Sequence, residues 1–185
     1  MAFWYLTLQC MYLLLPAAFA NMAPVMFKNS FKWMAISIDG GSMLGGNPLF
    51  GSHKTLRGFV VGIILAVLVS LVQAYFSKYP AMQQFSIVDF SQGYGFAATV
   101  GFLMGFGALF GDLMKSFIKR RAGIEAGRPF IPFDEIDFAI GGLAFSAMVI
   151  DVAWEIVAMS LGLAFIFHII TNHLAFYLKI RSEKW

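Results

Sequence analysis

Hydrophobic residues occur in four long runs along the chain, and polar residues gather between them. The runs cover residues 3–27, 58–76, 85–111 and 136–178. A helix that crosses a membrane needs about 20 apolar residues, so the first three runs each have the length of one crossing and the fourth has the length of two. The fourth run therefore predicts a helical hairpin, with its turn between Asp151 and Gly162, where polar residues fall. The pattern predicts an all-α integral membrane protein with five transmembrane helices.

The composition favours a membrane location over a soluble one. Of the 185 residues, 59% are hydrophobic and only 12% are charged, whereas about 25% of the residues in soluble domains are charged. So few charges cannot cover a protein surface in water. Five helices and their connections use nearly the whole length, so we expect residues 1–185 to form a single domain.

The positions of the basic residues predict how the chain is oriented in the membrane. Of the 13 Lys and Arg residues, 12 fall on one side of the five predicted helices, and Lys78 alone falls on the other. Cytoplasmic loops carry an excess of Lys and Arg. We therefore expect an N-terminus outside the cell, a cytoplasmic C-terminus, and two functional cytoplasmic loops at 28–57 and 112–137. The basic residues fit this orientation, and we expect no nucleic-acid partner.

A cleavable signal peptide is the alternative interpretation of the first 20 residues, because Ala18-Phe19-Ala20 resembles a cleavage site. Signal peptides begin with a positively charged segment. No basic residue precedes the apolar run, so we expect this run to be the first transmembrane helix.

Small residues in the third run predict close helix packing. Gly101, Gly105, Gly107 and Gly111 are separated mainly by intervals of four. Such intervals let helix backbones approach one another in membranes. We expect these glycines to pack against other helices of the chain, and an oligomer that uses the same glycines is the open alternative.

Three aspartates are expected to meet at the cytoplasmic boundary. Asp112 follows the third run, and Asp134 and Asp137 lie three residues apart at the start of the fourth. Positions three apart share a helix face, and successive helices are usually neighbours. Three close carboxylates repel one another unless their pKa values rise or a cation binds. Because Mg²⁺ prefers oxygen ligands and keeps sites for water and phosphate, we expect Mg²⁺ here. Helix capping is the alternative, especially for Asp134.

A polar helix face is expected where the third helix continues beyond its apolar run. Asp112, Lys115, Ser116, Lys119 and Arg120 follow at offsets of three, four, seven and eight, which place them on one face. A metal with Lys and Arg neutralises polyphosphates during phosphoryl or nucleotidyl transfer. Membrane orientation alone also explains basic residues here, so Arg121 is assigned no role.

The first loop is rich in glycine and ends where a helix is expected to begin. Its last part reads Gly51-x-x-Lys54-Thr55, which offers backbone N–H groups and a helix N-terminus to phosphate. The pattern GxxxxGK[ST] is absent, which excludes a P-loop nucleotidase. A flexible loop that binds nothing is the alternative.

Two polar residues in the last run lie at membrane depth. His168 and Asn172 are four residues apart and share a helix face. Polar groups at this depth usually face a cavity or the interior of the bundle. A hydrogen bond between helices is the alternative role for Asn172.

These residues belong to a longer series of motifs. In chain order the motifs are Asn21-x-x-Pro24, Asn47-Pro48-x-Phe50-Gly51-x-x-Lys54-Thr55-x-Arg57-Gly58, Gly111-Asp112-x-x-Lys115-Ser116-Phe117-x-Lys119-Arg120-Arg121, Pro132-x-Asp134-x-x-Asp137-Phe138, and His168-x-x-x-Asn172 with Tyr177 and Trp185. The series resembles the CDP-archaeol synthase family, a branch of the phosphatidate cytidylyltransferases, over nearly the whole chain. The sequence departs from the family at Glu135, where Gln is usual, and at Ser37-Ile38, where Pro usually precedes Asp39-Gly40.

The resemblance implies a membrane enzyme that uses CTP, Mg²⁺ and the isoprenoid ether lipid phosphate 2,3-bis-O-(geranylgeranyl)-sn-glycerol 1-phosphate. The products would be pyrophosphate and the CDP-activated lipid. The implied roles are metal binding for Asp112, Asp134 and Asp137; phosphate binding for Lys54, Arg57, Lys115, Lys119 and Arg120; orientation of the phosphates for Thr55 and Ser116; shaping of the nucleotide site for Asn47 and Gly51; and substrate contact for His168 and Asn172.

Three other functions are weighed against this one. A small transporter would need charged or polar residues at mid-membrane in several helices, and the middle parts of the first three runs contain almost none. A CDP-alcohol phosphotransferase would need the signature DGxxAR…GxxxDxxxD, which is absent. A phosphatidate cytidylyltransferase is the closer alternative, because apolar walls accept ester-linked acyl chains and ether-linked isoprenoid chains alike.

Overall fold

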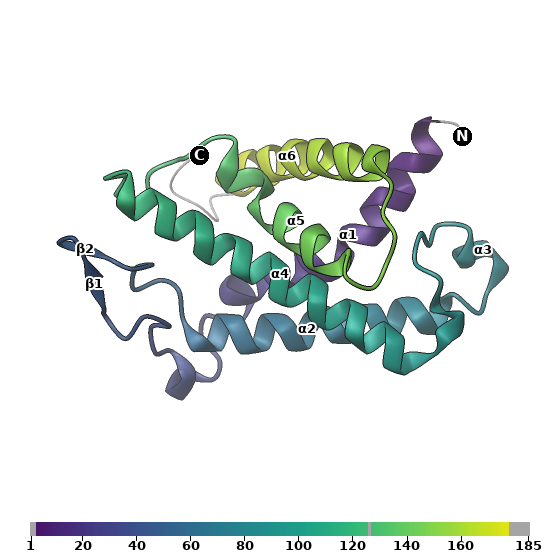
Figure 1. Cartoon of the computed structure of the whole chain (residues 1–185), viewed down its shortest axis with the longest axis horizontal. Helices are drawn as coiled ribbons and strands as arrows, with labels where there is room; N and C mark the ends of the chain where they lie inside the picture. Colours follow the sequence, from purple (N-terminus) through teal and green to yellow (C-terminus); the bar gives the residue numbers. More distant parts are fainter. Residues whose placement is uncertain (1–2, 126, 178–185) are drawn as a thin grey trace.

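The structure, a computed structural model, describes residues 3–125 and 127–177. Three long helices run beside one another, and the shorter α5 packs along α4 (Figure 1). Two strands of two residues each, β1 and β2, form an antiparallel hairpin at one end of this bundle. The elements are α1 (Phe3–Met26), η1 (Lys32–Met34), β1 (Met43–Leu44), β2 (Asn47–Pro48), α2 (Leu56–Phe76), α3 (Pro80–Gln83), η2 (Phe90–Gln92), α4 (Tyr94–Arg121), α5 (Phe133–Ser146) and α6 (Trp154–Tyr177).

Four helices have the length and composition of membrane crossings: α1, α2, α4 and α6. α5 contains 14 residues, which rise about 21 Å at 1.5 Å per residue. That length is less than the hydrocarbon core of about 30 Å. The prediction of an all-α, multi-pass membrane protein is confirmed. Of the five predicted crossings, four have a full-length helix in the described ranges.

The third long helix begins and ends later than its apolar run. The prediction that residues 85–93 are part of it is wrong, because they form η2 and its connections. The Asp89 carboxylate caps η2 by accepting from the Ser91 amide at 2.9 Å, and Gly93 adopts φ 95°, which only glycine adopts readily. At its other end α4 continues to Arg121. The predicted continuation of the polar face as a helix is confirmed.

The last apolar run does form two helices, but the turn lies earlier than predicted. α5 ends at Ser146 and α6 begins at Trp154, so Ser160 and Gly162 lie inside α6. Ser146 and Ser160 are both fully buried. The Ser146 hydroxyl donates to the carbonyl of the preceding turn, at Leu143, over 3.1 Å. Ser160 is equally buried in the first half of α6, so a small polar residue does not by itself mark a turn.

Glycines allow α4 to lie at the centre of the bundle. A Cβ on Gly107 would collide with the carbonyl of Gly141 in α5, and a Cβ on Gly111 would collide with the carbonyl of Asp137. Gly101 and Gly105 make similarly close approaches to α2. The prediction that these glycines pack within the chain is confirmed. The contact at Gly111 brings the start of α5, with its aspartates, against α4.

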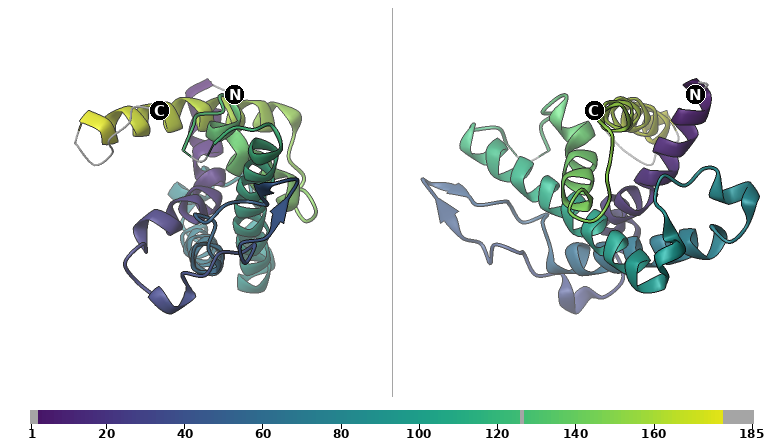
Figure 2. Two further views of the ribbon diagram at one scale, coloured as in Figure 1. Left: turned by 90° about the vertical axis from the view of Figure 1, so that its left-hand side faces the viewer. Right: turned by 45° about the vertical axis from the view of Figure 1, so that its right-hand side comes forward.

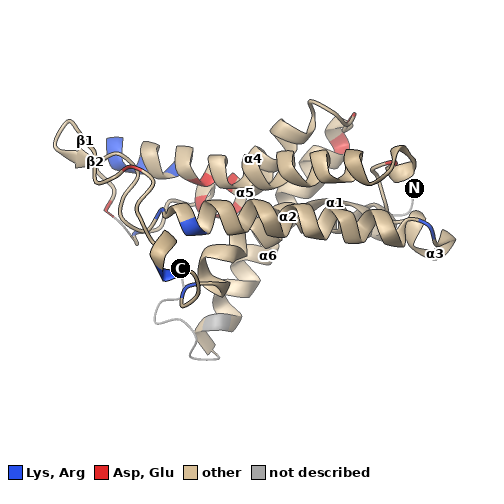
Figure 3. Ribbon diagram, turned by 90° about the horizontal axis from the view of Figure 1, so that it is seen from below, with Lys and Arg blue, Asp and Glu red and all other residues tan. Residues whose placement is uncertain are grey.

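α6 leaves the bundle after packing against α1 and α5 (Figure 2). Charged residues are distributed unevenly along the bundle (Figure 3). The end that carries β1 and β2 holds most of the described Lys and Arg residues, whereas Lys78 lies between α2 and α3, beyond the other end of α2. Three of the 12 basic residues expected on one side of the membrane, Lys179, Arg181 and Lys184, lie outside the described residues.

Candidate active site

Asp39 organises the glycine-rich first loop. Its Oδ1 accepts from the Ser37 hydroxyl at 2.6 Å and from the Gly41 amide at 3.0 Å. Its Oδ2 accepts from the amides of Phe50 and Gly51, each at 3.0 Å. The Ser37 hydroxyl and the Phe50 amide hold the pKa of the Asp39 carboxyl well below its usual range. The loop therefore folds around one carboxylate. The Gly51 amide donates its hydrogen bond to this carboxylate.

The first loop is also fixed to the two helices beside it. Its start pairs with the residues before α2, since the Ile38 amide donates to the Lys54 carbonyl at 2.8 Å. Its hairpin reaches α4, where Arg121 donates to the carbonyls of Asn47 at 3.2 Å and Pro48 at 2.7 Å. The Phe50 ring lies 6.4 Å from the Phe117 ring between these contacts. The loop thus positions Lys54 beside α4.

Lys115 lies at the centre of a cluster of charges. Its Nζ is 3.1 Å from Asp112 Oδ1, 3.1 Å from Asp134 Oδ1 and 2.7 Å from Asp137 Oδ2. Two further lysines flank this group: Lys54 contacts Asp112 at 2.6 Å, and Lys119 contacts Asp134 at 3.0 Å. The three aspartates meet as the sequence predicts, and an ammonium group lies between them. We call this set the lysine–aspartate cluster: Lys54, Asp112, Lys115, Lys119, Asp134 and Asp137.

The cluster is enclosed and its charges balance. Its side chains are between 5% exposed, for Asp137, and 26% exposed, for Lys54. Buried charges are costly unless they are paired, and three ammonium groups here face three carboxylates. As it stands, the cluster can hold its side chains in fixed positions but carries no net charge to attract an anion.

Asp134 and Lys119 also fix the connection between α4 and α5. Asp134 Oδ2 accepts from the Phe130 amide at 2.6 Å, and the Lys119 ammonium donates to the Arg128 carbonyl. The proposed capping role of Asp134 is thus present in part, as a bond to the turn just before α5. The same carboxylate also contacts Lys115, so Asp134 can bond to the turn and belong to the charged site at the same time.

Thr55 and Arg57 hold the first loop to α2. The Thr55 hydroxyl caps the helix by accepting from the Gly58 amide at 3.2 Å. The Arg57 guanidinium is buried and donates to the carbonyls of Lys28 at 2.7 Å and Ser30 at 3.1 Å. Ser116 is buried within α4. The Nε atom of Arg120 is buried without a hydrogen-bond partner.

The two predicted polar residues of α6 are not members of this cluster. His168 lines an apolar groove between α1 and α6, together with Thr171 and Asn21. Asn172 follows one turn after His168 on the same helix. The structure therefore brings together the predicted site residues of α4, α5 and the first loop, and it places His168 of α6 in the neighbouring groove rather than in the cluster.

The donor set fits Mg²⁺ in chemistry. In the described ranges, no group of three or more acidic, histidine or cysteine side chains is arranged to enclose a metal. The three aspartates surround the ammonium of Lys115 instead. Mg²⁺ commonly uses one or two carboxylates and takes its other ligands from water and substrate phosphates. The carboxylates of the cluster are therefore suitable partial ligands.

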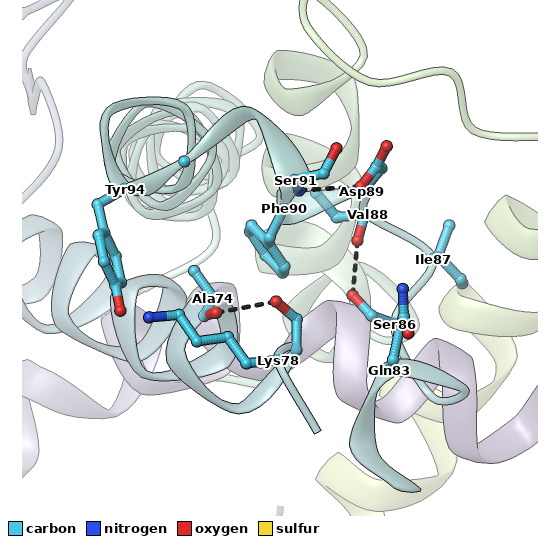
Figure 4. A pocket seen from close by; sticks show the side chains of 12 residues that line it. Ala74, Lys78, Gln83, Ser86, Ile87, Val88, Asp89, Phe90, Ser91 and Tyr94 are labelled. Atoms are coloured by element: carbon cyan, nitrogen blue, oxygen red, sulfur yellow. Dashed lines mark hydrogen bonds between the residues drawn. The ribbon is translucent and has the colours of Figure 1, made fainter. Parts of the chain in front are cut away.

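A second cavity lies at the far end of α2 and α4 (Figure 4). It has a volume of about 470 Å³ and contains Lys78, whose Nζ lies 5.2 Å from the centre of the Tyr94 ring. Tyr94 and Asp112 are 18 residues apart on one helix, or about 27 Å along its axis. This cavity is therefore separate from the lysine–aspartate cluster.

Sequence reasoning missed two residues that shape the site. Asp39 stands before two glycines, a turn signal that could have identified it as a carboxylate bonding to nearby amides. Arg121 was attributed to membrane orientation, but it binds Asn47 and Pro48, more than 70 residues earlier. No local pattern reveals a contact of that separation.

Together, the fold and the cluster define a multi-pass membrane protein with a buried, charge-paired site where helix ends meet a glycine-rich loop. Comparison with known families makes the assignment specific. Residues 3–185 match the model of a family described as "CarS-like: CDP-archaeol synthase". The chain belongs to this family, and it is an enzyme that uses CTP for cytidylyl transfer in archaeal lipid synthesis.

Individual relatives support the assignment over the full length. The chain is 35% identical to a CDP-archaeol synthase of Thermococcus kodakarensis, over 100% of this chain and 95% of that one. It is 30% identical to one from Methanocaldococcus jannaschii, over 99% of each. It also resembles a solved structure reported as "Structural insight into an intramembrane enzyme for archaeal membrane lipids biosynthesis", with a TM-score of 0.65, 30% identity, and coverage of 88% of this chain and 91% of that one.

Proposed function

We propose that this enzyme, with Mg²⁺, transfers the cytidylyl group of CTP to 2,3-bis-O-(geranylgeranyl)-sn-glycerol 1-phosphate. The products are pyrophosphate and the CDP-activated ether lipid. The observation that carries the proposal is the lysine–aspartate cluster, in which Lys115 contacts three aspartates at the polar end of apolar helices. The name shared by the relatives, CDP-archaeol synthase, supports an archaeal lipid as the acceptor.

The reaction needs charge neutralisation more than proton transfer. An oxygen of the lipid phosphate attacks the α-phosphorus of CTP, and the bond from that phosphorus to the bridging oxygen of the β-phosphate breaks. Pyrophosphate leaves with the bonding electrons. Because the attacking oxygen is already an anion, no strong general base is needed. The enzyme's task is to align two anions and stabilise the charge on the transferring group.

The cluster residues divide this task. Lys54, Lys115 and Lys119 would contact phosphate oxygens, and the aspartates would hold their ammonium groups in place before the substrates bind. Such preorganised charges lose little energy to reorientation during the reaction. Arg120, whose Nε is buried without a partner, would add a further positive charge. Arg57 and Thr55 would act by holding the loop that carries Lys54.

A bound Mg²⁺ would supply the positive charge that a balanced cluster lacks. Three lysines and three aspartates cancel, so two phosphate-bearing substrates would bring uncompensated negative charge into an enclosed site. Asp112, Asp134 and Asp137 would hold the ion together with substrate phosphates, and the ion would stabilise charge on the transferring group.

The site is proposed to face the cytoplasm, with the N-terminus outside, the C-terminus in the cytoplasm, α5 as a short fifth crossing, and residues 1–185 as a single domain. The collection of Lys and Arg at the end that holds the cluster supports this orientation. CTP would enter from the cytosol, and the lipid would keep its chains in the bilayer.

Pyrophosphate release by the purified protein tests the proposal. The reaction contains CTP, Mg²⁺ and one of three additions: the geranylgeranyl ether lipid phosphate, phosphatidate, or no lipid. We expect release with the ether lipid, and loss of release when EDTA removes Mg²⁺. Equal rates with phosphatidate would retract the ether specificity. No release with any lipid, from folded protein, would contradict the cytidylyltransferase and favour a transport role.

A further inference from the structure

An apolar groove of about 500 Å³ runs between α1 and α6. On α1 its lining extends from Leu8 to Met22, a distance of about 21 Å at 1.5 Å per residue. Phe85 and Phe138 complete the wall. Its volume is within the range of about 300–1,000 Å³ that is typical of small-molecule sites. The groove is therefore long, narrow and apolar, a shape that suits a hydrocarbon chain better than a nucleotide.

Polar groups occur at a few positions in this apolar lining. Asn21 belongs to the last turns of α1, and His168 and Thr171 belong to the second half of α6. Leu8 and Met11 lie toward the opposite end of α1. Polar residues are costly at membrane depth and usually serve a cavity or a ligand. Asn21 thus places a polar group at the end of the groove nearest the first loop.

That end of the groove adjoins the lysine–aspartate cluster along two elements. Pro24 lies one turn after Asn21 in α1 and lines a small cavity, of about 50 Å³, whose wall also includes Lys54 and Asp112. In α5, Phe138 lines the groove and directly follows Asp137 of the cluster. A molecule in the groove would therefore have its polar end one helical turn from the charged site.

The side of the groove is open to the surroundings of the helices. Leu8 is 39% exposed and Phe167 is 42% exposed, although both line the groove. Both belong to helices with the length and composition of membrane crossings. A lipid could therefore enter sideways from the bilayer without leaving it.

We infer that this groove binds one isoprenoid chain of the lipid phosphate substrate and holds its phosphate against the lysine–aspartate cluster. The inference rests on the proposed function and extends it to a site for the chain. Asn21 and His168 border the region where chain and headgroup join. The second chain remains in the bilayer, which the open side of the groove allows.

Filling the groove tests this inference. Ala18 is half-buried and lies on the α1 wall one turn before Asn21, so Ala18→Phe would place a ring where the chain runs. Ala158 is exposed on α6 and lies outside the groove lining, so Ala158→Phe is the matched control. Each variant is assayed in mixed micelles with the geranylgeranyl lipid phosphate and with an analogue whose two ether chains have five carbons each.

The expected result is a selective effect on the long lipid. Ala18→Phe should raise KM for the geranylgeranyl substrate at least tenfold, with kcat and the KM for CTP within twofold of wild type. Its turnover of the short analogue should be unchanged, which shows that the variant is folded and its reactive site intact. Ala158→Phe should match wild type with both lipids.

Two results would overturn the inference. One is an unchanged KM of Ala18→Phe for the long lipid. The other is an equal loss with long and short lipids in both Ala18→Phe and the milder Leu15→Phe, because a chain groove has no part in using the short lipid. Failure of the wild-type enzyme with every lipid would instead contradict the proposed function, and the inference with it.

Discussion

At the residue scale, Lys115 holds the site together. Its ammonium is the common partner of Asp112, Asp134 and Asp137, and its side chain is only 14% exposed. Without it, three carboxylates in an enclosed space would repel one another. The same lysine that is proposed to contact phosphate therefore also stabilises the three neighbouring carboxylates in the folded protein.

Replacing Lys115 should destabilise the protein as well as inactivate it. Removing one partner from a buried ion pair costs about 3–5 kcal/mol, because the other charge is left unpaired. Lys115→Met should therefore lower the thermal unfolding midpoint in detergent and abolish turnover. The control is Lys78→Met, at an exposed lysine far from the cluster. A Lys115→Met protein as stable as wild type would contradict the central place given to this ammonium.

The double variant separates the two effects. Adding Asp112→Asn to Lys115→Met removes one of the repelling charges, so part of the lost stability should return while activity stays absent. If the double variant were less stable than Lys115→Met, repulsion between the carboxylates would not explain the loss.

At the scale of elements, the contact between α4 and α5 sets the geometry of the site. Gly107 and Gly141 let the two backbones touch, and Gly111 lies against the Asp137 carbonyl. The carboxylate of Asp137 reaches Lys115 because of this approach. A sub-ångström change in helix spacing would separate groups that now lie 2.7 Å apart.

Adding one methyl group at this contact should impair both folding and turnover. Overpacking a tight interface costs about 1–3 kcal/mol, so Gly107→Ala should lower the unfolding midpoint and reduce activity at least tenfold. Gly95→Ala is the matched control in the same helix, since a Cβ there would meet no atom within 4 Å. Wild-type activity and stability in Gly107→Ala would show that the helices are not held at this distance.

The first loop should respond to pH through Asp39. A carboxyl whose pKa is lowered by folding stabilises the folded loop at pH values above its unfolded pKa of about 4. That contribution is lost as the pH falls through the folded pKa. We expect the amides of Phe50 and Gly51 to be protected from hydrogen exchange at neutral pH, and to lose protection only in acid. The measured exchange rates are corrected for the pH dependence of the intrinsic exchange rate.

Asp39→Ala should remove this protection already at neutral pH. The matched control is Asp151→Ala, at an exposed aspartate in the connection between α5 and α6. Protection of both amides in Asp39→Ala equal to that in wild type would show that the loop does not depend on this carboxylate.

The elements show why sequence predicts some features and not others. The long helices follow from runs of apolar residues, and the meeting of the aspartates follows from their spacing and from the adjacency of successive helices. The late start of α4 follows the local bond of Asp89 and the positive φ of Gly93, which apolarity does not record, and no apolar pattern marks the turn between α5 and α6. The bond from Arg121 to the hairpin depends on tertiary structure alone.

At the scale of the whole molecule, one end of the bundle combines the charged cluster, most of the described basic residues and the polar end of the groove. The far end carries the cavity around Lys78. A molecule with this asymmetry would take a soluble substrate from one side only. The proposed orientation identifies that side with the cytoplasm.

Labelling of introduced cysteines should reveal the orientation. The buried Cys10 is replaced by alanine, and single cysteines are introduced at the exposed positions Ser52 and Ser91. Ser52 lies just before the start of α2, and Ser91 lies beside the end of α2 and the start of α4. In intact spheroplasts, a membrane-impermeant maleimide should label Ser91→Cys at once and Ser52→Cys only after permeabilisation. The reverse pattern would place the site outside the cytoplasm.

The central claim is that the cluster transfers the α-phosphorus of CTP, with its cytidine, to a lipid phosphate. The most direct measurement follows radioactive phosphorus from CTP into the lipid product. With purified protein, Mg²⁺ and the geranylgeranyl lipid phosphate, label in the α position should enter the lipid, and label in the γ position should leave as pyrophosphate. Asp112→Asn should neither transfer the α label to lipid nor release the γ label in pyrophosphate, while Asp151→Asn should do both as wild type does. Label from the γ position in the lipid, or none from the α position, would contradict the account.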